Sequence, residues 1–160
     1  MAEQERLNRT ARVRATQASA DAFVQASLST GLSAATPTGM LIKQVMVDLP
    51  GVTALSALGA DFGLEFTITR STKSAIPNLS DSDCLMRYGI AGLLTTSGLA
   101  ILPCTFFFPQ ESGQLIVQDT LYFQFDSNGV GSALSCDFLI DYEFVSLKEI
   151  EFLRLLAAQP

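Results

Sequence analysis

Histidine and tryptophan are both absent from this chain of 160 residues. Without histidine, the chain cannot form Ser-His-Asp or Cys-His catalytic groups, His-ligated zinc or iron sites, or the usual metal site of a cupin. Without tryptophan, it lacks the Cys–Trp–Cys core signature of immunoglobulin domains and the aromatic platform on which many sugar-binding modules stack their ligand. These absences leave structural and binding roles open, and any catalysis would depend on carboxylates.

Cysteine is scarce, and long apolar runs are missing. Cys84, Cys104 and Cys136 follow neither a zinc-binding nor a Cys-x-x-Cys spacing, so we expect buried thiols that pack as small hydrophobic groups. The longest apolar stretches, Ile90–Leu94 and Leu99–Pro109, fall short of the ~20 residues of a membrane-spanning helix. No apolar run follows the N-terminal arginines as it does in a secretion signal. We therefore expect no membrane span, no secretion signal and no cofactor.

Charged residues are also few. They make up 16% of the chain, against about 25% in a typical soluble domain, while 48% of the residues are hydrophobic. With so few charges to cover the outside, we expect apolar surface to be buried between subunits, and the alternative is a monomer with an unusually apolar core. The length indicates a single domain that buries roughly 70% of its unfolded surface.

Residues 1–20 differ in composition from the rest of the chain. They hold four arginines against two glutamates, a balance of +2, whereas the remaining residues carry −8. Because this segment has little apolar content and no evident strand pattern, we expect an N-terminal arm that becomes ordered on docking against neighbouring subunits. The arginines are Arg6, Arg9, Arg12 and Arg14. They are too sparse to favour binding of nucleic acid, which needs clustered cations.

Residues 21–146 show the pattern of short β-strands separated by turns. The clearest strand is 61–70, where large apolar residues at alternate positions of Phe62–Ile68 define a core face and the residues between them a wet face. The last long strand, 132–145, places the alternate apolar residues of Leu134–Phe144 on one face. Further strands are expected at 23–28, 40–49, 84–95, 99–108 and 114–125, with a break near Asp119.

Two local patterns complete the outline of the fold. Asp126–Gly129 contains Asn-Gly, which accepts positive φ, and predicts a hairpin between the last two strands. Ser146 and Glu149 match a capping box and predict a helix over 147–160, packed on the sandwich or on a neighbour. Seven or eight strands and little helix predict an all-β fold, an antiparallel two-sheet sandwich. This pattern alone does not separate a jelly roll from an immunoglobulin-like topology, although the missing tryptophan disfavours the latter.

Carboxylates on the last strand are the best candidates for chemistry. Asp137, Asp141 and Glu143 project from one face at two-residue spacing, which suits the roughly 5–10 Å separation of glycosidase carboxylates. No companion motif supports that activity, so a solvated strand face is the favoured interpretation. Ser80–Asp83 offers carboxylates for calcium but lacks the ligand pattern of a calcium loop, and is interpreted as a solvated turn. We expect neither an enzyme nor a metal site.

Surplus apolar residues mark candidate contacts between subunits. Phe106–Phe108 cannot all face one core, so at least one of these rings is expected to point toward a neighbour. The C-terminal helix is apolar nearly all round, which favours a contact between subunits in addition to packing on its own sandwich. Its expected apolar face holds Leu147, Ile150, Leu153, Leu156 and Ala157, widened by Phe152 and Leu155. The candidate contact residues are Arg6, Arg9, Arg12, Arg14, Phe106, Phe107, Phe108, Ile150, Phe152, Leu153 and Leu156.

The layout of the whole chain resembles small viral capsid proteins with a single jelly roll. The resemblance is carried by the arginine-bearing arm at Arg6–Arg14, the strands from Phe23 to Val145, and the closing segment Asp141–Leu156. It implies a jelly-roll sandwich over 21–146, an arm over 1–20, and a helix over 147–160. It covers the chain in outline and identifies no particular virus group.

The resemblance also implies a function. A capsid subunit assembles with copies of itself into a virion shell through sandwich contacts and its N-terminal arm, and other virion proteins are further candidate partners. Coats that neutralise RNA carry denser basic arms than this chain, so contact of the arm with a genome is not favoured. The alternatives are a carbohydrate- or ligand-binding sandwich module and a subunit of a filament or surface layer.

Overall fold

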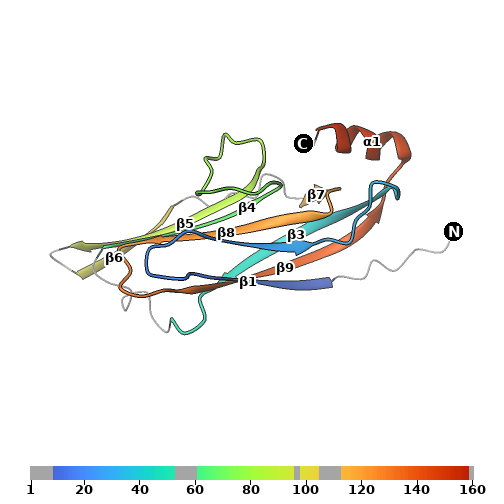
Figure 1. The fold of residues 1–160 in the computed structure, drawn as a ribbon. Helices are drawn as coiled ribbons and strands as arrows, with labels where there is room; N and C mark the ends of the chain where they lie inside the picture. The colour runs from blue at the N-terminus through green and yellow to red at the C-terminus, as the bar shows by residue number, and fades with distance from the viewer. Residues whose placement is uncertain (1–8, 53–60, 96–97, 105–112, 159–160) are drawn as a thin grey trace.

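The protein is a sandwich of two antiparallel β-sheets with a short C-terminal helix (Figure 1). The computed structural model describes residues 9–52, 61–95, 98–104 and 113–158. Sheet A contains, in spatial order, β1 (Arg9–Thr16), β9 (Ser135–Ser146), β3 (Thr38–Asp48) and β7 (Gln114–Ile116). Sheet B contains β2 (Val24–Ser29), β8 (Thr120–Asn128), β4 (Phe62–Thr69), β5 (Cys84–Thr95) and β6 (Gly98–Cys104). The prediction of an all-β, two-sheet sandwich is confirmed.

The strand pairs are nested in the manner of a jelly roll. The first strand pairs with the last, β2 with β8, β3 with β7, and β4 with β5, so the chain folds back on itself as one long hairpin. The pairs β3–β9 and β4–β8 then close the two sheets. This order distinguishes a jelly roll from an immunoglobulin-like sandwich. In addition, β6 extends sheet B beyond β5 and forms one of its two edges, opposite β2.

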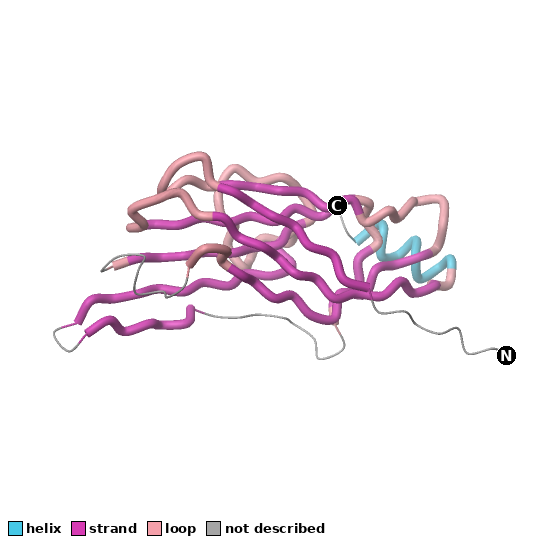
Figure 2. Tube along the Cα trace, turned by 90° about the horizontal axis from the view of Figure 1, so that it is seen from below, coloured by secondary structure: helices cyan, strands magenta, loops and turns pink. Residues whose placement is uncertain are grey.

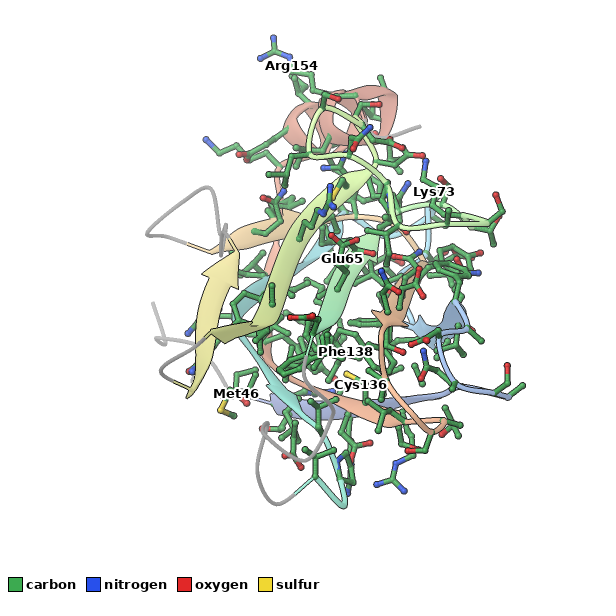
Figure 3. All side chains as sticks on the ribbon, turned by 90° about the vertical axis from the view of Figure 1, so that its left-hand side faces the viewer. Met46, Glu65, Lys73, Cys136, Phe138 and Arg154 are labelled. Atoms are coloured by element: carbon green, nitrogen blue, oxygen red, sulfur yellow. The ribbon has the colours of Figure 1, made fainter. Side chains whose placement is uncertain are left out.

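Aromatic rings from both sheets fill the space between them. Phe66 stacks on Phe125 with ring centroids 5.2 Å apart, and both contribute from sheet B. Phe138 of β9 packs against Phe123 at 5.2 Å and lies between the sheets (Figure 3). Cys136, two residues earlier on the same face, is a fully buried free thiol whose pKa is raised by burial. The predicted alternation of β4 and β9 therefore positions the core as expected.

The N-terminal segment departs from expectation, because residues 9–16 form β1 rather than part of an arm. Ala11, Val13 and Ala15 occupy alternate positions and face the core, with Val13 and Ala15 buried. Small alanines alternating with arginines obscure the two-residue period in the sequence. The expectation that residues 1–20 contain no strand is therefore wrong. The sandwich begins at Arg9 instead of at residue 21. Residues 1–8 lie outside the described part of the chain.

The predicted hairpin at Asp126–Gly129 is also wrong. β8 and β9 lie in opposite sheets, so the segment between them crosses the sandwich instead of joining paired strands. Gly129 does adopt positive φ, at 72°, as the Asn-Gly pattern predicts. The Asp21 carboxylate accepts a hydrogen bond from the Val130 amide at 2.9 Å and fixes the crossing. A sheet-to-sheet crossing and a hairpin need the same turn residues, which is why the sequence does not distinguish them.

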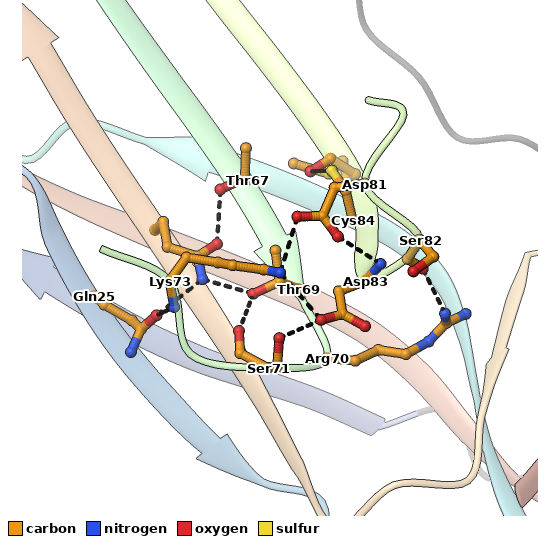
Figure 4. Close-up of polar contacts among 12 residues, drawn as sticks. Gln25, Thr67, Thr69, Arg70, Ser71, Lys73, Asp81, Ser82, Asp83 and Cys84 are labelled. Carbon is orange, nitrogen blue, oxygen red and sulfur yellow. Dashed lines mark hydrogen bonds and ion pairs between the residues drawn. The ribbon is translucent and has the colours of Figure 1, made fainter. Parts of the chain in front are cut away.

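The outer face of β4 is covered toward the C-terminal end of the strand, whereas Glu65 near its middle stays partly exposed. Thr67 and Thr69 are fully buried, and both hydroxyls hydrogen-bond to the side chain of Gln124 on β8, at 2.7 and 2.6 Å. Gln124 also donates to Gln25, whose side-chain oxygen accepts from the amide of Lys73 at 2.9 Å (Figure 4). The loop between β4 and β5 therefore folds back over sheet B.

The C-terminal helix, α1 (Glu149–Ala158), begins later than the capping-box pattern predicts. Ser146 is still part of β9, where it pairs with Thr38 of β3, so its hydroxyl is not at a helix N-cap. The first helical hydrogen bond runs from the Phe152 amide to the Lys148 carbonyl at 2.9 Å. Pairing in the sheet has overridden the local capping signal. Within the described residues, no helix has the length and apolar character needed to cross a bilayer.

Candidate assembly surfaces

An ionic cluster on the outer face of sheet A holds the edge strand β1 against β9. Arg14 donates two hydrogen bonds to the Asp137 carboxylate, from Nε to Oδ1 at 2.7 Å and from Nη2 to Oδ2 at 2.8 Å. Arg12 also donates to Asp137. The carboxylate side chain is 1% exposed, while the two arginine side chains stay about half exposed at 52–55%. The arginines thus form a partly solvated cover over a buried anion.

These contacts fix the charge of Asp137. Hydrogen bonds from Arg14, and then from Arg12, hold the pKa of the Asp137 carboxyl far below its usual range. The group therefore carries no proton to donate near neutral pH, and a glycosidase acid needs one. The arrangement suits a structural ion cluster rather than a catalytic pair.

The other two carboxylates of the predicted glycosidase set are also engaged with neighbouring strands. Glu143 is 1% exposed, and its Oε2 lies 2.9 Å from Lys43 Nζ on β3. Asp141 accepts a hydrogen bond from the Thr10 hydroxyl at 2.8 Å. The interpretation as a solvated face is therefore wrong for Asp137 and Glu143, because cations from adjacent strands cover them. All three carboxylates join β9 to its neighbours in sheet A.

Three of the four arginines assigned to the arm contact residues of their own chain. Arg9 lies over the ring of Phe144, 5.0 Å from its centroid, in a cation–π contact. Arg12 and Arg14 bind Asp137 as described, and Arg6 lies outside the described residues. Contacts of these side chains with a second subunit stay a prediction.

The acidic turn considered for calcium binds a lysine. Lys73 Nζ lies 2.9 Å from Asp81 Oδ2 and 3.0 Å from Asp83 Oδ2 (Figure 4). Ser71 also donates to Asp83, and this bond, together with Lys73, lowers the pKa of the Asp83 carboxyl. The ammonium group thus occupies the place between the carboxylates that a cation would take. Among the described residues, no group of three metal-ligating side chains is present.

Helix α1 presents an apolar face to solvent. Ile150 and Leu153 are 69% and 56% exposed, whereas Phe152 is 3% exposed and anchors the helix to the body. Leu155 and Leu156 are half-buried on the body side. The expected apolar stripe is therefore divided: Ile150, Leu153 and Ala157 are exposed, whereas Leu147 and Leu156 are half-buried. A helix that is apolar nearly all round leaves its orientation undetermined by sequence. Arg154 also points away from the body (Figure 3).

The remaining exposed apolar side chains are scattered. Met46 is 44% exposed on the outer face of β3, opposite Leu139 in register, and points away from the core (Figure 3). Leu79 is 48% exposed in the loop between β4 and β5. Neither forms part of a larger stripe of exposed large side chains among the described residues, so α1 carries the best-defined apolar surface.

The β6 edge of sheet B is the second candidate surface. β6 pairs with β5 on one side and no described strand pairs with its other side. The stretch from Tyr88 to Gln110 that includes this strand contains no charged residue. Charged side chains normally protect edge strands from pairing with other chains. The predicted contact residues Phe106, Phe107 and Phe108 lie outside the described part of the structure.

The two surfaces lie at opposite ends of the molecule. α1 sits at one end of the sandwich, and β5 and β6 project at the other, as both the ribbon and the view from below show (Figures 1 and 2). The surfaces that stand out in this fold are suited to binding other protein chains.

Comparison with known proteins finds distant likeness among solved structures alone. No protein-family model matches the chain, and no curated protein matches it. Among solved structures, the VP1 protein of Trichodysplasia spinulosa-associated polyomavirus is similar at 10% identity with a TM-score of 0.49, over 88% of this chain and 96% of that chain. The jelly-roll assignment rests on the strand order and pairing given above.

Proposed function

We propose that this chain is a structural subunit that assembles with copies of itself into a closed shell, as the capsid protein of a virus does. The observation that carries the proposal is the apolar face of α1, where Ile150 and Leu153 stand exposed although Phe152 holds the helix to the body. Burying a leucine or isoleucine side chain contributes about 1.5–3 kcal/mol. A surface of this kind, on a chain with few charges, is suited to burial between subunits.

The fold and chemistry agree with a structural role. Jelly rolls serve as capsid, lectin and cupin domains, and the metal chemistry of cupins depends on histidines that this sequence lacks. Asp137 and Glu143, which the sequence suggested as glycosidase carboxylates, form ion pairs with arginine and lysine. A subunit that repeats each contact around a closed shell needs only modest energy per contact, because linked contacts raise the effective concentration.

Within this proposal the partners are further copies of the chain and other virion proteins, and the location is the virion. Genome binding is not assigned to the arginines of β1. Arg12 and Arg14 share the carboxylate of Asp137, and Thr10 holds a further carboxylate, Asp141, on the same face. Carboxylates are therefore interspersed among the described cations of this face, which disfavours a dense phosphate-binding cluster there.

Negative-stain imaging of the purified chain tests the proposal. At micromolar concentration in physiological salt, we expect closed particles of uniform diameter. Open fibres or flat sheets would instead indicate the filament or surface-layer alternative, since a contact that does not close gives an open assembly. A population of single molecules without larger particles would contradict both.

A further inference from the structure

The exposed face of α1 has the residue order of a parallel two-stranded coiled coil. Ile150, Leu153 and Ala157 follow one another at spacings of three and four, so they form one stripe along the helix. All three are exposed, and the stripe lies on the side away from Phe152. In heptad terms isoleucine stands at an a position and leucine at the following d position, the combination that favours parallel dimers.

The charged residues beside the stripe are complementary. Glu149 precedes the stripe on one flank and Arg154 lies on the other, at the g and e positions of the same heptad. In a parallel pair of helices, a g residue faces the e residue of the partner five positions later, so Glu149 would face the partner's Arg154. Both side chains are exposed, and neither forms an ion pair within the described part of the chain. The two-fold operation repeats the pair on both sides of the stripe.

Attachment to the sandwich stabilises α1, which is too short to be stable as a free helix. A free helix of ten residues is too short to be stable in water, but α1 is held by Phe152 and follows directly from β9. Its contact face is therefore formed before association, which removes the ordering cost of binding. Its end position on the molecule leaves it accessible to a second copy (Figure 2).

We infer that α1 is a two-fold contact of the assembly: it packs in parallel against α1 of a second copy through Ile150, Leu153 and Ala157, with Glu149 paired to Arg154 across the interface. The inference rests on the proposed function, because it specifies one of the contacts by which copies associate. The occupant is a second copy and not a different protein, since the stripe and its flanking charges complement themselves.

Charge reversal provides the test, with sedimentation velocity of the full chain as the readout. Arg154→Glu places glutamate on both flanks, and Glu149→Arg places arginine on both. Each variant alone is expected to weaken the α1 contact by roughly tenfold or more, since two attractive pairs become repulsive. The double variant E149R/R154E should associate as the wild type does. Circular dichroism checks that every variant keeps the fold.

Mixing separates a contact between chains from an effect within one chain. The Glu149→Arg and Arg154→Glu chains together restore opposite charges only across an interface, so their mixture should associate more tightly than either chain alone. Lys148→Glu is the matched control. It reverses one exposed positive charge one residue before Glu149, at the f position of the heptad, and should leave association unchanged.

Cross-linking tests the parallel orientation. In a parallel pair each stripe residue faces its own copy, so Ile150→Cys and Leu153→Cys should each form a disulfide between identical positions, identified by peptide mapping against the native cysteines. A cross-link at only one of these positions would contradict the parallel arrangement.

The outcomes distinguish this inference from the proposed function. If the wild type assembles and the single charge variants assemble equally well, the α1 contact is wrong and the shell subunit stands. If removal of residues 1–8 abolishes association while the mixture restores nothing, the N-terminal segment and not α1 supplies the contact, and the inference is again wrong. If the wild type never associates, both fail.

Discussion

At the scale of the residue, the most consequential group is the buried carboxylate of Asp137. It accepts hydrogen bonds from two arginines of β1 and is 1% exposed, so it joins the edge strand to the centre of sheet A. A buried anion of this kind depends on its partners, because desolvation without them is costly. Asp137 is therefore a structural residue whose removal should be felt in stability.

We expect Asp137→Asn to lower the free energy of unfolding by about 2 kcal/mol, since charge-assisted hydrogen bonds are lost while two half-exposed arginines stay hydrated. Urea denaturation measures the change. Asp48→Asn, on the same outer face but exposed, is the control and should change stability by less than about 0.5 kcal/mol. Equal effects of the two substitutions would show that the cluster contributes nothing specific.

The lowered pKa of the Asp137 carboxyl predicts that the free energy of unfolding depends on pH. Its pKa is depressed in the folded state, so the stability it contributes is fully present above the ordinary aspartate pKa of about 4 and is lost as the pH falls toward the folded value. Unfolding free energies measured between pH 6 and 3 should therefore fall less steeply for Asp137→Asn than for the wild type. Parallel curves for the two proteins would contradict this assignment.

At the scale of the element, two segments determine how the chain closes into a jelly roll. β1 forms the outer edge of sheet A and pairs with β9 along eight residues. The segment after β8 carries the chain from sheet B to sheet A, and Gly129 makes that crossing possible. Each segment has a variant with a matched control.

Gly129→Ala should lower the free energy of unfolding by about 2–3 kcal/mol. The backbone adopts a φ of 72°, and a Cβ there would lie 2.1 Å from the carbonyl oxygen of Asp61. Gly131→Ala is the control, because a Cβ at that position has nothing within 4 Å. Thermal denaturation should show a clear loss for the first variant and little change for the second.

Truncation distinguishes β1 from the eight residues before it. Deleting residues 1–16 removes the strand and leaves Asp137 buried without its arginines, so we expect a chain that is unfolded or aggregated. Deleting residues 1–8 should leave the sandwich folded. Soluble yield and circular dichroism report both. A folded product after the longer deletion would show that β1 is not an integral strand.

The sequence predicts these elements unequally, for physical reasons. β4 and β9 could be located because large side chains such as Phe66 and Phe138 alternate on one face. β1 was missed because alanines carry its period, and the crossing after β8 was mistaken for a hairpin because both need positive φ at Gly129. The start of α1 was missed because Ser146 stays paired in the sheet.

The candidate site was less predictable than the fold. The carboxylates of β9 could be found from their spacing, but the arginines that cover Asp137 come from a strand 123–125 residues away, and no local pattern indicates that pairing. The outward direction of Ile150 and Leu153 depends on how α1 docks. An apolar helix leaves that choice to tertiary packing.

At the scale of the whole molecule, the two candidate contact surfaces lie at opposite ends of an elongated sandwich (Figure 1). One end bears the exposed stripe of α1, and the other bears the uncharged strand β6, which lies at an edge of sheet B. Two distinct contact surfaces at opposite ends allow one subunit to join more than one neighbour, which a closed shell requires. The net charge of −6 opposes nonspecific association of free subunits.

Light scattering of the wild type beside Leu153→Glu, across a range of protein concentrations, tests the central claim most directly. We predict a wild-type mass of many subunits that is reached cooperatively as concentration rises, and a much smaller mass for the variant with an unchanged circular dichroism spectrum. A wild-type mass equal to one chain of 17.2 kDa at every concentration would contradict the account.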